Sequence, residues 1–401
     1  MTIPPNVDTI FRNAIDLNQY SNSVARRIIN IYNDIIIDAV NQLQTINEAR
    51  APVKAARLRA ILAQLKDSLA TWAGDATEIT ALELQGLAEL QSEFVEEQLR
   101  LALPAGARDM VRTVEISPQF AQSVVTTDPT QINVVALSDD LFAAVEGAPQ
   151  TFSLTAPKGA MITLPNGRVV EKSFRGLAES QAERFSSSVR QALLTGETTQ
   201  ELSRKLRGTL EFGEEAKTIK QLALSGGEAT KMAGRQVTSI VRTSINQVAN
   251  AASQQVYEAN QDITKKYRYV ATLDSRTTAI CRANDGREFE YGKGPTPPLH
   301  FSCRSTTVPV IDYEGLGFDP PRPGKRAAKG GMVDSDTSYG QWLLQQGKER
   351  QQEVLGSKAP YFRMLARKHG ARDAMAKLVR EDGRELTLDE LRSRYGAIEK
   401  R

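Results

Sequence analysis

Both cysteines of this 401-residue chain and one of its two histidines lie in a single short stretch of sequence. Cys281 and Cys303 are 22 positions apart, and His300 lies three positions before Cys303. A loop of this length can bring two thiolates and an imidazole around one ion, and such donors suit zinc. A nearby carboxylate, Asp274 or Asp285, could complete a tetrahedron. One hypothesis is therefore a zinc site with the ligands Cys281, His300, Cys303 and Asp274.

Two other interpretations of these residues stay open at the level of sequence. The cysteines can be free, buried thiols beside a packed histidine, since two cysteines in a chain this long make no disulfide framework. They can also form a Cys281–Cys303 disulfide once the protein leaves a reducing compartment. Only three clear donors are present, fewer than in a Cys-x-x-Cys…Cys-x-x-Cys pattern, so the spacing does not choose among the three interpretations.

The same residues raise the question of catalysis. A Cys281–His300 pair could form an activated nucleophile. Zinc nucleobase deaminases need a glutamate shortly after the histidine and two cysteines further on, whereas Phe301 and Ser302 follow His300 here. The second histidine, His369, is far along the chain, and no His-Glu-x-x-His, Walker or Gly-x-Ser-x-Gly motif occurs. We expect no catalytic residues; the alternative is a zinc-dependent or Cys/His enzyme acting on nucleic acid or a small molecule.

The residues around the cysteines indicate a compact module that holds its shape. Asp285-Gly286 is typical of a tight turn, here expected between two short strands, because glycine tolerates a positive φ. A strand is expected to end at Asp274, whose carboxylate can pair with Arg276 or Arg304. Such charges are more often structural than catalytic.

Composition places few limits on function. Apolar residues make up 40% of the chain, and 51 basic against 48 acidic side chains leave a net charge of +3, which alone does not indicate nucleic acid. No run of 18 apolar residues occurs, so no membrane-spanning helix is expected. Residues 1–5 lack the basic flank and apolar segment of a secretory signal. The length predicts two to four domains.

The N-terminal region, residues 1–110, is expected to form a helical bundle or hairpin. Apolar residues recur at three- and four-residue steps from Val24 to Ala39, which places them on one helix face. Pro52 is expected to end this helix, and Gly74 to separate two further helices over residues 53–72 and 77–103. Their apolar faces either pack on one another or dock on copies of the chain or a larger partner.

Residues 111–175 differ in pattern and are expected to form a small β-containing insert. Asn166-Gly167 lies between two apolar-alternating runs, residues 161–164 and 168–171, which is a strong β-hairpin signal.

Helical periodicity returns in residues 176–311, which end in the cysteine module. A long helix is expected over residues 228–260, and its Arg242 is expected to reach a carboxylate of the module. Thr198 and Glu201 fit a capping box at the start of a preceding helix.

Residues 312–338 are rich in Pro, Gly and basic residues and are expected to form a linker. Residues 339–401 are expected to form a helical, basic tail, in which Thr387 and Glu390 fit a second capping box. From Lys358 onward the tail holds twelve Lys/Arg and seven Asp/Glu, an excess of five positive charges. The expected fold class is therefore α+β, mainly α.

The cysteine module resembles the C-terminal module of the Mu F-like head-morphogenesis family, the minor head (minor capsid) proteins of tailed bacteriophages. The family pattern is Asp-x-Arg-Thr, a cysteine, an Asp/Asn-Gly turn, and Pro-x-His-x-x-Cys-Arg. The resemblance covers roughly residues 177–395. The matching residues are Asp274, Arg276, Thr277, Cys281, Asp285, Gly286, Pro298, His300, Cys303 and Arg304.

The resemblance implies a low-copy structural protein that joins the phage head during assembly, near the portal, and acts by binding. Its implied partners are the portal protein, the major capsid protein or both, with self-association as a further expectation. Contact with genomic DNA is expected through the basic tail, because clustered positive charge attracts phosphates without regard to sequence. The expected place is the virion head, after synthesis in the cytoplasm of the bacterial host.

Overall fold

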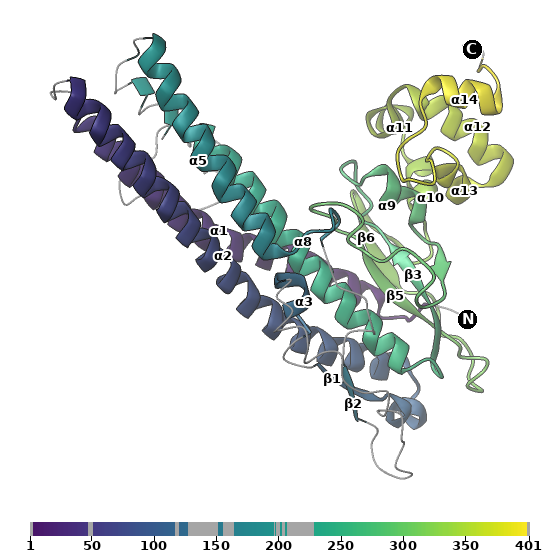
Figure 1. Ribbon diagram of the computed structural model, residues 1–401. Coiled ribbons are helices and arrows are strands. Elements are labelled where there is room, and N and C mark those ends of the chain that lie inside the picture. Colours follow the sequence, from purple (N-terminus) through teal and green to yellow (C-terminus); the bar gives the residue numbers. More distant parts are fainter. Residues whose placement is uncertain are drawn as a thin grey trace.

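The structure is a computed structural model that describes residues 3–46, 51–116, 120–126, 151–154, 164–195, 197, 201–202, 205–206 and 228–398. It confirms the α+β, mainly α class (Figure 1). Long helices extend from one end of the molecule, and a small sheet with a group of short helices lies at the other. No helix in the described ranges combines the length and the apolar character needed to cross a membrane.

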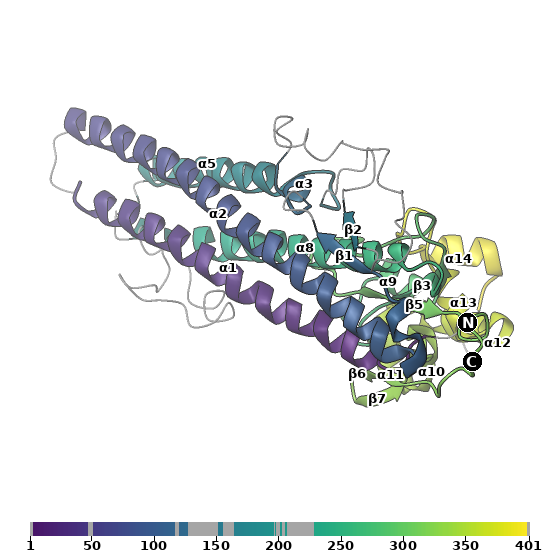
Figure 2. The same ribbon diagram turned by 90° about the horizontal axis from the view of Figure 1, so that it is seen from below.

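Four long helices run side by side in both views (Figures 1 and 2). Trp72 lies at the centre of their shared core, with its ring centroid 5.2 Å from that of Tyr32 and 6.0 Å from that of Phe174. Its indole N–H donates to the carbonyl of Ile28 at 3.0 Å, so the buried ring leaves no polar atom unsatisfied. The helices are α1 (Val7–Gln44), α2 (Ala51–Ala102), α5 (Val170–Thr195) and α8 (Glu228–Ala259).

Helix α2 is continuous, whereas the sequence predicted two helices separated near Gly74. A glycine inside a helix costs only about 1 kcal/mol relative to alanine. The neighbouring Trp72 and Ala76 are buried in the shared core, and their packing outweighs that cost. Pro52 lies in the first turn of α2, where its missing N–H has no helical partner to lose. The proline therefore belongs to the start of a helix.

The region 111–175 contains less β-structure than predicted among its described residues. The turn at Asn166-Gly167 is confirmed, since the N–H of Leu164 donates to the carbonyl of Arg168 at 2.9 Å and Gly167 has φ 72°. The strand expected over 168–171 is wrong, because α5 begins at Val170. The first expected strand lies outside the described residues except for Leu164. The other elements are η1 (Ala105–Met110), β1 (Thr113–Ile116), α3 (Gln122–Val125) and β2 (Thr151–Leu154), with β1 and β2 paired in parallel.

A three-stranded antiparallel sheet supports the cysteine module. Its central strand is β3 (Thr264–Val270), flanked by β4 (Glu288–Phe289) and β5 (Thr306–Ile311). Every residue of β5 is buried. One face of the sheet packs on the start of α1, where Phe11 lies among valines of β3 and β5. The N-terminal helices and the module are thus joined through a common core.

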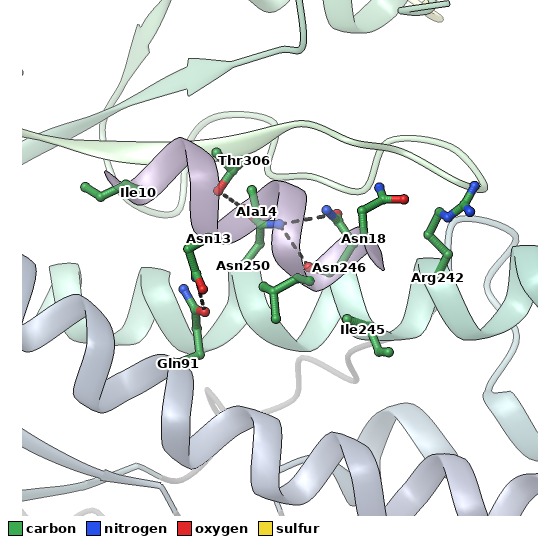
Figure 3. Close-up of a pocket in the computed structure, with 11 residues that line it drawn as sticks. Ile10, Asn13, Ala14, Asn18, Gln91, Arg242, Ile245, Asn246, Asn250 and Thr306 are labelled. Carbon is green, nitrogen blue, oxygen red and sulfur yellow. Dashed lines mark hydrogen bonds between the residues drawn. The ribbon is translucent and has the colours of Figure 1, made fainter. Parts of the chain in front are cut away.

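A largely buried set of polar contacts links α1 to α2, α2 to α8, and α8 to the first residue of β5 (Figure 3). The Asn13 amide donates to Gln91 at 2.8 Å, and Gln91 donates to Ser253 at 3.0 Å. Asn250 accepts from the Thr306 hydroxyl at 3.3 Å and donates to Asn246. The adjoining cavity is about 20 Å³, enough for one water. Because an unpaired buried amide costs about 1–3 kcal/mol, this network favours one register of the helices.

Residues 312–338 are more ordered than the predicted linker. A β-hairpin forms within them from β6 (Lys325–Ala328) and β7 (Gly331–Asp334). Arg326 of β6 is 1% exposed and reaches back to the cysteine module. A basic residue in a Pro- and Gly-rich segment is therefore part of the core, which the composition of the segment does not reveal.

The C-terminal region is helical, as predicted, and has its own core around Trp342 and Phe362. The capping box of Thr387 and Glu390 is confirmed at the start of α14. The box expected at Thr198 lies outside the described residues. The elements are α10 (Tyr339–Gln345), α11 (Lys348–Leu355), η2 (Gly356–Lys358), α12 (Ala359–His369), α13 (Ala371–Ala376) and α14 (Leu388–Tyr395).

Candidate metal centre

The fold brings both cysteines and His300 together. Cys281 lies on α9 (Ala279–Asn284), while His300 and Cys303 lie on the loop that leads into β5. The Cys281 Sγ is 3.7 Å from the Cys303 Sγ and 3.3 Å from the His300 Nε2. The ligand atoms of all three residues lie within 4.8 Å of one another. Both sulfurs are buried and the imidazole is partly exposed, so the three donors surround one nearly enclosed point.

The loop carrying His300 and Cys303 is tied to α8. Ser302 has φ 57°, a conformation that L-residues adopt only at a cost. Its N–H donates to the Thr243 hydroxyl at 2.9 Å, and its own hydroxyl lies 3.1 Å from that of Ser239. These contacts stabilise the strained residue. The long helix therefore sets the positions of two of the three donors.

Hydrogen bonds also orient the imidazole. The His300 Nδ1 lies 2.9 Å from the carbonyl of Phe301, which can only accept, so Nδ1 carries the proton. In the neutral ring Nε2 is then unprotonated and carries the free lone pair. It faces the Cys281 Sγ and lies 2.8 Å from the Thr278 hydroxyl. This arrangement of one nitrogen held by a carbonyl and the other directed into a donor cluster is typical of metal-binding histidines.

The two cysteines of the cluster ionise unequally. The hydrogen bond with Cys281 holds the pKa of the Cys303 thiol well below its usual range, burial opposes this shift, and His300 lowers the pKa further. The same hydrogen bond, together with burial, raises the pKa of Cys281. Burial lowers the pKa of His300, but its hydrogen bond to Cys303 and the charge of that sulfur outweigh burial and raise it. Of the two cysteines, Cys303 is therefore the one that ionises more readily.

Asp274, the predicted fourth ligand, does not join this group of donors. Its two carboxylate oxygens accept from the guanidinium of Arg304 at 2.7 and 2.8 Å. Thr277 and the Arg276 N–H donate to the same carboxylate. The predicted pairing of Asp274 is thus confirmed with Arg304, and the more distant Arg276 side chain lies 3.6 Å away. The ligand group therefore consists of Cys281, His300 and Cys303 without Asp274.

Asp285, the other carboxylate considered, is committed to the backbone and to Arg326. It is 1% exposed and accepts from the N–H of Ala271 at 2.6 Å, the N–H of Tyr339 at 2.5 Å and the Arg326 guanidinium at 3.1 Å. Gly286 has φ 77°, as the turn required. The turn joins α9 to β4, so the prediction of a strand on both sides is wrong.

Arg242 does not reach a carboxylate of the module, contrary to prediction. Its guanidinium donates to the Asn22 side chain of α1 at 2.6 Å. Burial, with the positive charges of Arg304 and Arg276, lowers its pKa. The residue therefore connects α8 to α1.

Sequence reasoning missed several residues of the site. The Tyr269 hydroxyl lies 3.1 Å from the Cys281 Sγ, and Thr278 faces His300. Arg282 follows Cys281 and connects α9 to the C-terminal helices through Glu385, at 2.5 Å, and the carbonyl of Val354. Two of these residues could have been predicted from local sequence. Tyr269 lies in the expected strand before the cysteines, and Thr278 lies just before a short helix. The partners of Arg282 are too distant in sequence.

Comparison with known proteins adds one match. Residues 183–308 match a family model described as phage Mu protein F like protein, which agrees with the resemblance seen in the sequence. This segment runs from the middle of α5 through α8 and the cysteine module to the start of β5. The curated proteins contain no match, and neither do the solved structures.

Proposed function

From the assignment of residues 183–308 to the Mu F-like family, we propose that the protein is a minor structural component of a tailed-phage head that acts in head morphogenesis near the portal. The family match carries this proposal and points to a structural, head-related role. The architecture suits binding: long helices extend from a compact module, and both share cores that keep them in one arrangement (Figure 1). The expected place of action is the virion head, after synthesis in the host cytoplasm.

Exposed leucines on α2 are candidates for docking on the portal or the shell. Leu82 and Leu90 are 70% and 67% exposed and two helical turns apart, so they lie close to one face of the helix. Burying two such side chains against a partner contributes about 3–6 kcal/mol.

Co-expression with the portal protein and, separately, with the major capsid protein of the same phage tests the docking. We expect co-elution with at least one of them on gel filtration. The double variant Leu82→Ser/Leu90→Ser is expected to bind at least tenfold more weakly, while the exposed Gln64→Ser on the same helix binds as the natural protein does. Failure to co-elute with either partner would contradict a place near the portal or in the shell.

The basic C-terminal region is the proposed DNA contact. Several of its acidic side chains are already paired within the chain, as in Arg380–Glu390 and Lys358–Glu385. The side chains of Arg367, Lys368 and Arg394 are exposed at the ends of α12 and α14. Such charges attract phosphates in a salt-dependent way without reading sequence.

An enzyme is the second candidate, and the Cys281–His300 contact of 3.3 Å is the observation in its favour. Against it, the residues Cys281 and Cys303 are 1% and 0% exposed, so a substrate has no direct approach to either sulfur. The Cys281 pKa is raised, which disfavours the thiolate that a nucleophile needs. The buried sulfurs favour a structural site, which is compatible with the structural family.

A further inference from the structure

Two of the three distances among the donors, both measured from the Cys281 Sγ, are close to those around a single tetrahedral zinc ion. Two sulfurs bound at about 2.3 Å with a tetrahedral angle lie about 3.8 Å apart, and a sulfur and a nitrogen about 3.6 Å apart. The observed separations are 3.7 Å between the sulfurs and 3.3 Å from the Cys281 Sγ to the His300 Nε2. A disulfide requires sulfurs at about 2.05 Å, which is much shorter. Cys281 is therefore already spaced from both other donors as an ion requires, and all three donors lie within 4.8 Å of one another.

The chemistry of the donors selects the ion. Two thiolates and one imidazole suit zinc and exclude the hard cations Mg²⁺ and Ca²⁺, which take oxygen ligands. Two thiolate charges balance a divalent ion, so the enclosed site becomes neutral when filled.

We propose that Cys281, His300 and Cys303 bind one zinc ion as a structural clamp. With Asp274 and Asp285 held by arginines, the fourth position falls to the Thr278 hydroxyl or to a water that enters from the partly exposed side of His300. Coordination joins α9 to the loop before β5 and adds to the hydrogen bond between Thr278 and His300 that already links these segments. The clamp does not depend on the proposed role in the phage head.

The clamp has a consequence for the C-terminal helices. Cys281 is followed directly by Arg282, which donates to Val354 and Glu385 of the C-terminal region. At the end of the same helix, Asp285 accepts from the backbone of Tyr339. Helix α9 therefore connects the metal site to the C-terminal core. We expect removal of the metal to loosen this connection before it affects α1 and α2.

Elemental analysis of the full chain, purified without a metal-affinity tag under reducing conditions with zinc in the growth medium, tests the proposal. We expect about one equivalent of zinc per chain. Cys281→Ser, Cys303→Ser and His300→Ala are expected to fall below about a tenth of an equivalent. His369→Ala removes the distant histidine and is expected to keep its zinc. Less than a tenth of an equivalent in the natural chain would overturn the proposal.

A second measurement covers variants that fail to fold. The natural chain, stripped with a chelator and titrated with Co²⁺, should develop thiolate-to-cobalt charge transfer and the visible bands of tetrahedral cobalt at one equivalent. Hydrogen exchange should rise in residues 279–303 and 339–345 after stripping and return with zinc. Absence of the cobalt bands, or a Cys281–Cys303 disulfide found by mass spectrometry in protein prepared under reducing conditions, contradicts the clamp.

Discussion

Asp274 and Arg304 form a bidentate ion pair, with the two guanidinium nitrogens 2.7 and 2.8 Å from the two carboxylate oxygens. Their side chains are 15% and 21% exposed. Asp274 lies shortly after β3, and Arg304 directly follows Cys303. The pair therefore links these two segments of the chain. Because it spans the loop of the metal site without touching the sulfurs, it holds the shape of that loop in the absence of an ion.

Replacing Asp274 with Asn is expected to destabilise the protein by about 2–4 kcal/mol, because Arg304 is left partly buried without its counter-charge. The exposed pair Asp382–Arg384 offers a control, since Asp382→Asn should cost less than about 1 kcal/mol. Urea unfolding followed by circular dichroism measures both. Equal losses for the two variants would show that the Asp274 pair has no special role.

The same carboxylate predicts a pH dependence of stability. Burial alone would raise the pKa of Asp274, but the hydrogen bonds and charge of Arg304 lower it to about 2 in the folded protein. The unfolded value is about 3.9, so the carboxylate contributes stability above about pH 4 that is lost as the pH falls towards 2. The difference in unfolding free energy between the natural chain and Asp274→Asn should therefore shrink between pH 5 and pH 2.5. A difference that stays constant over this range contradicts the assignment.

The buried pair of Asp285 and Arg326 predicts an asymmetry between its two partners. Their side chains are 0% and 2% exposed. Asp285→Ala should cost about 3–5 kcal/mol, because it leaves the charge of Arg326 unpaired and removes the acceptor of two backbone N–H groups. Arg326→Met should cost less, because those N–H groups still hold the carboxylate. Thermal unfolding of the two variants measures which one loses more stability. A larger loss in Arg326→Met than in Asp285→Ala would be inconsistent with this network.

The C-terminal region predicts a defined salt dependence of DNA binding. Each phosphate neutralised contributes about −0.9 to the slope of log K against log salt. The triple variant Arg367→Ala/Lys368→Ala/Arg394→Ala should bind duplex DNA more weakly and with a slope smaller in magnitude by about 2–3. Arg384→Ala, whose charge is already paired with Asp382, serves as the control. Fluorescence anisotropy at several salt concentrations measures the slope, and an unchanged slope in the triple variant would exclude these residues as the contact.

Local patterns predicted much of the fold. The long helix α8, the turn at Gly286 and the capping box at Thr387 depend on neighbouring residues, which the sequence shows directly. The separation near Gly74 was predicted wrongly because the cost of one glycine is small beside the burial of Trp72, and the partners of that ring come from other helices.

The candidate site was predicted in composition but not in detail. Cys281, His300 and Cys303 do come together, whereas the expected ligand Asp274 is bound by Arg304. Sequence spacing indicates which residues can meet, but competition between a metal and an arginine for one carboxylate is decided by three-dimensional placement. For the same reason Arg326 was assigned to a linker, because its partner lies 41 positions earlier in the chain.

Quantitative mass spectrometry of purified virions can decide whether the protein is a minor component of the phage head. After nuclease treatment and density-gradient purification, we expect the chain at a constant, low number of copies per particle, far below that of the major capsid protein. Its absence from finished particles, or its loss together with nuclease-accessible DNA, would contradict the claim.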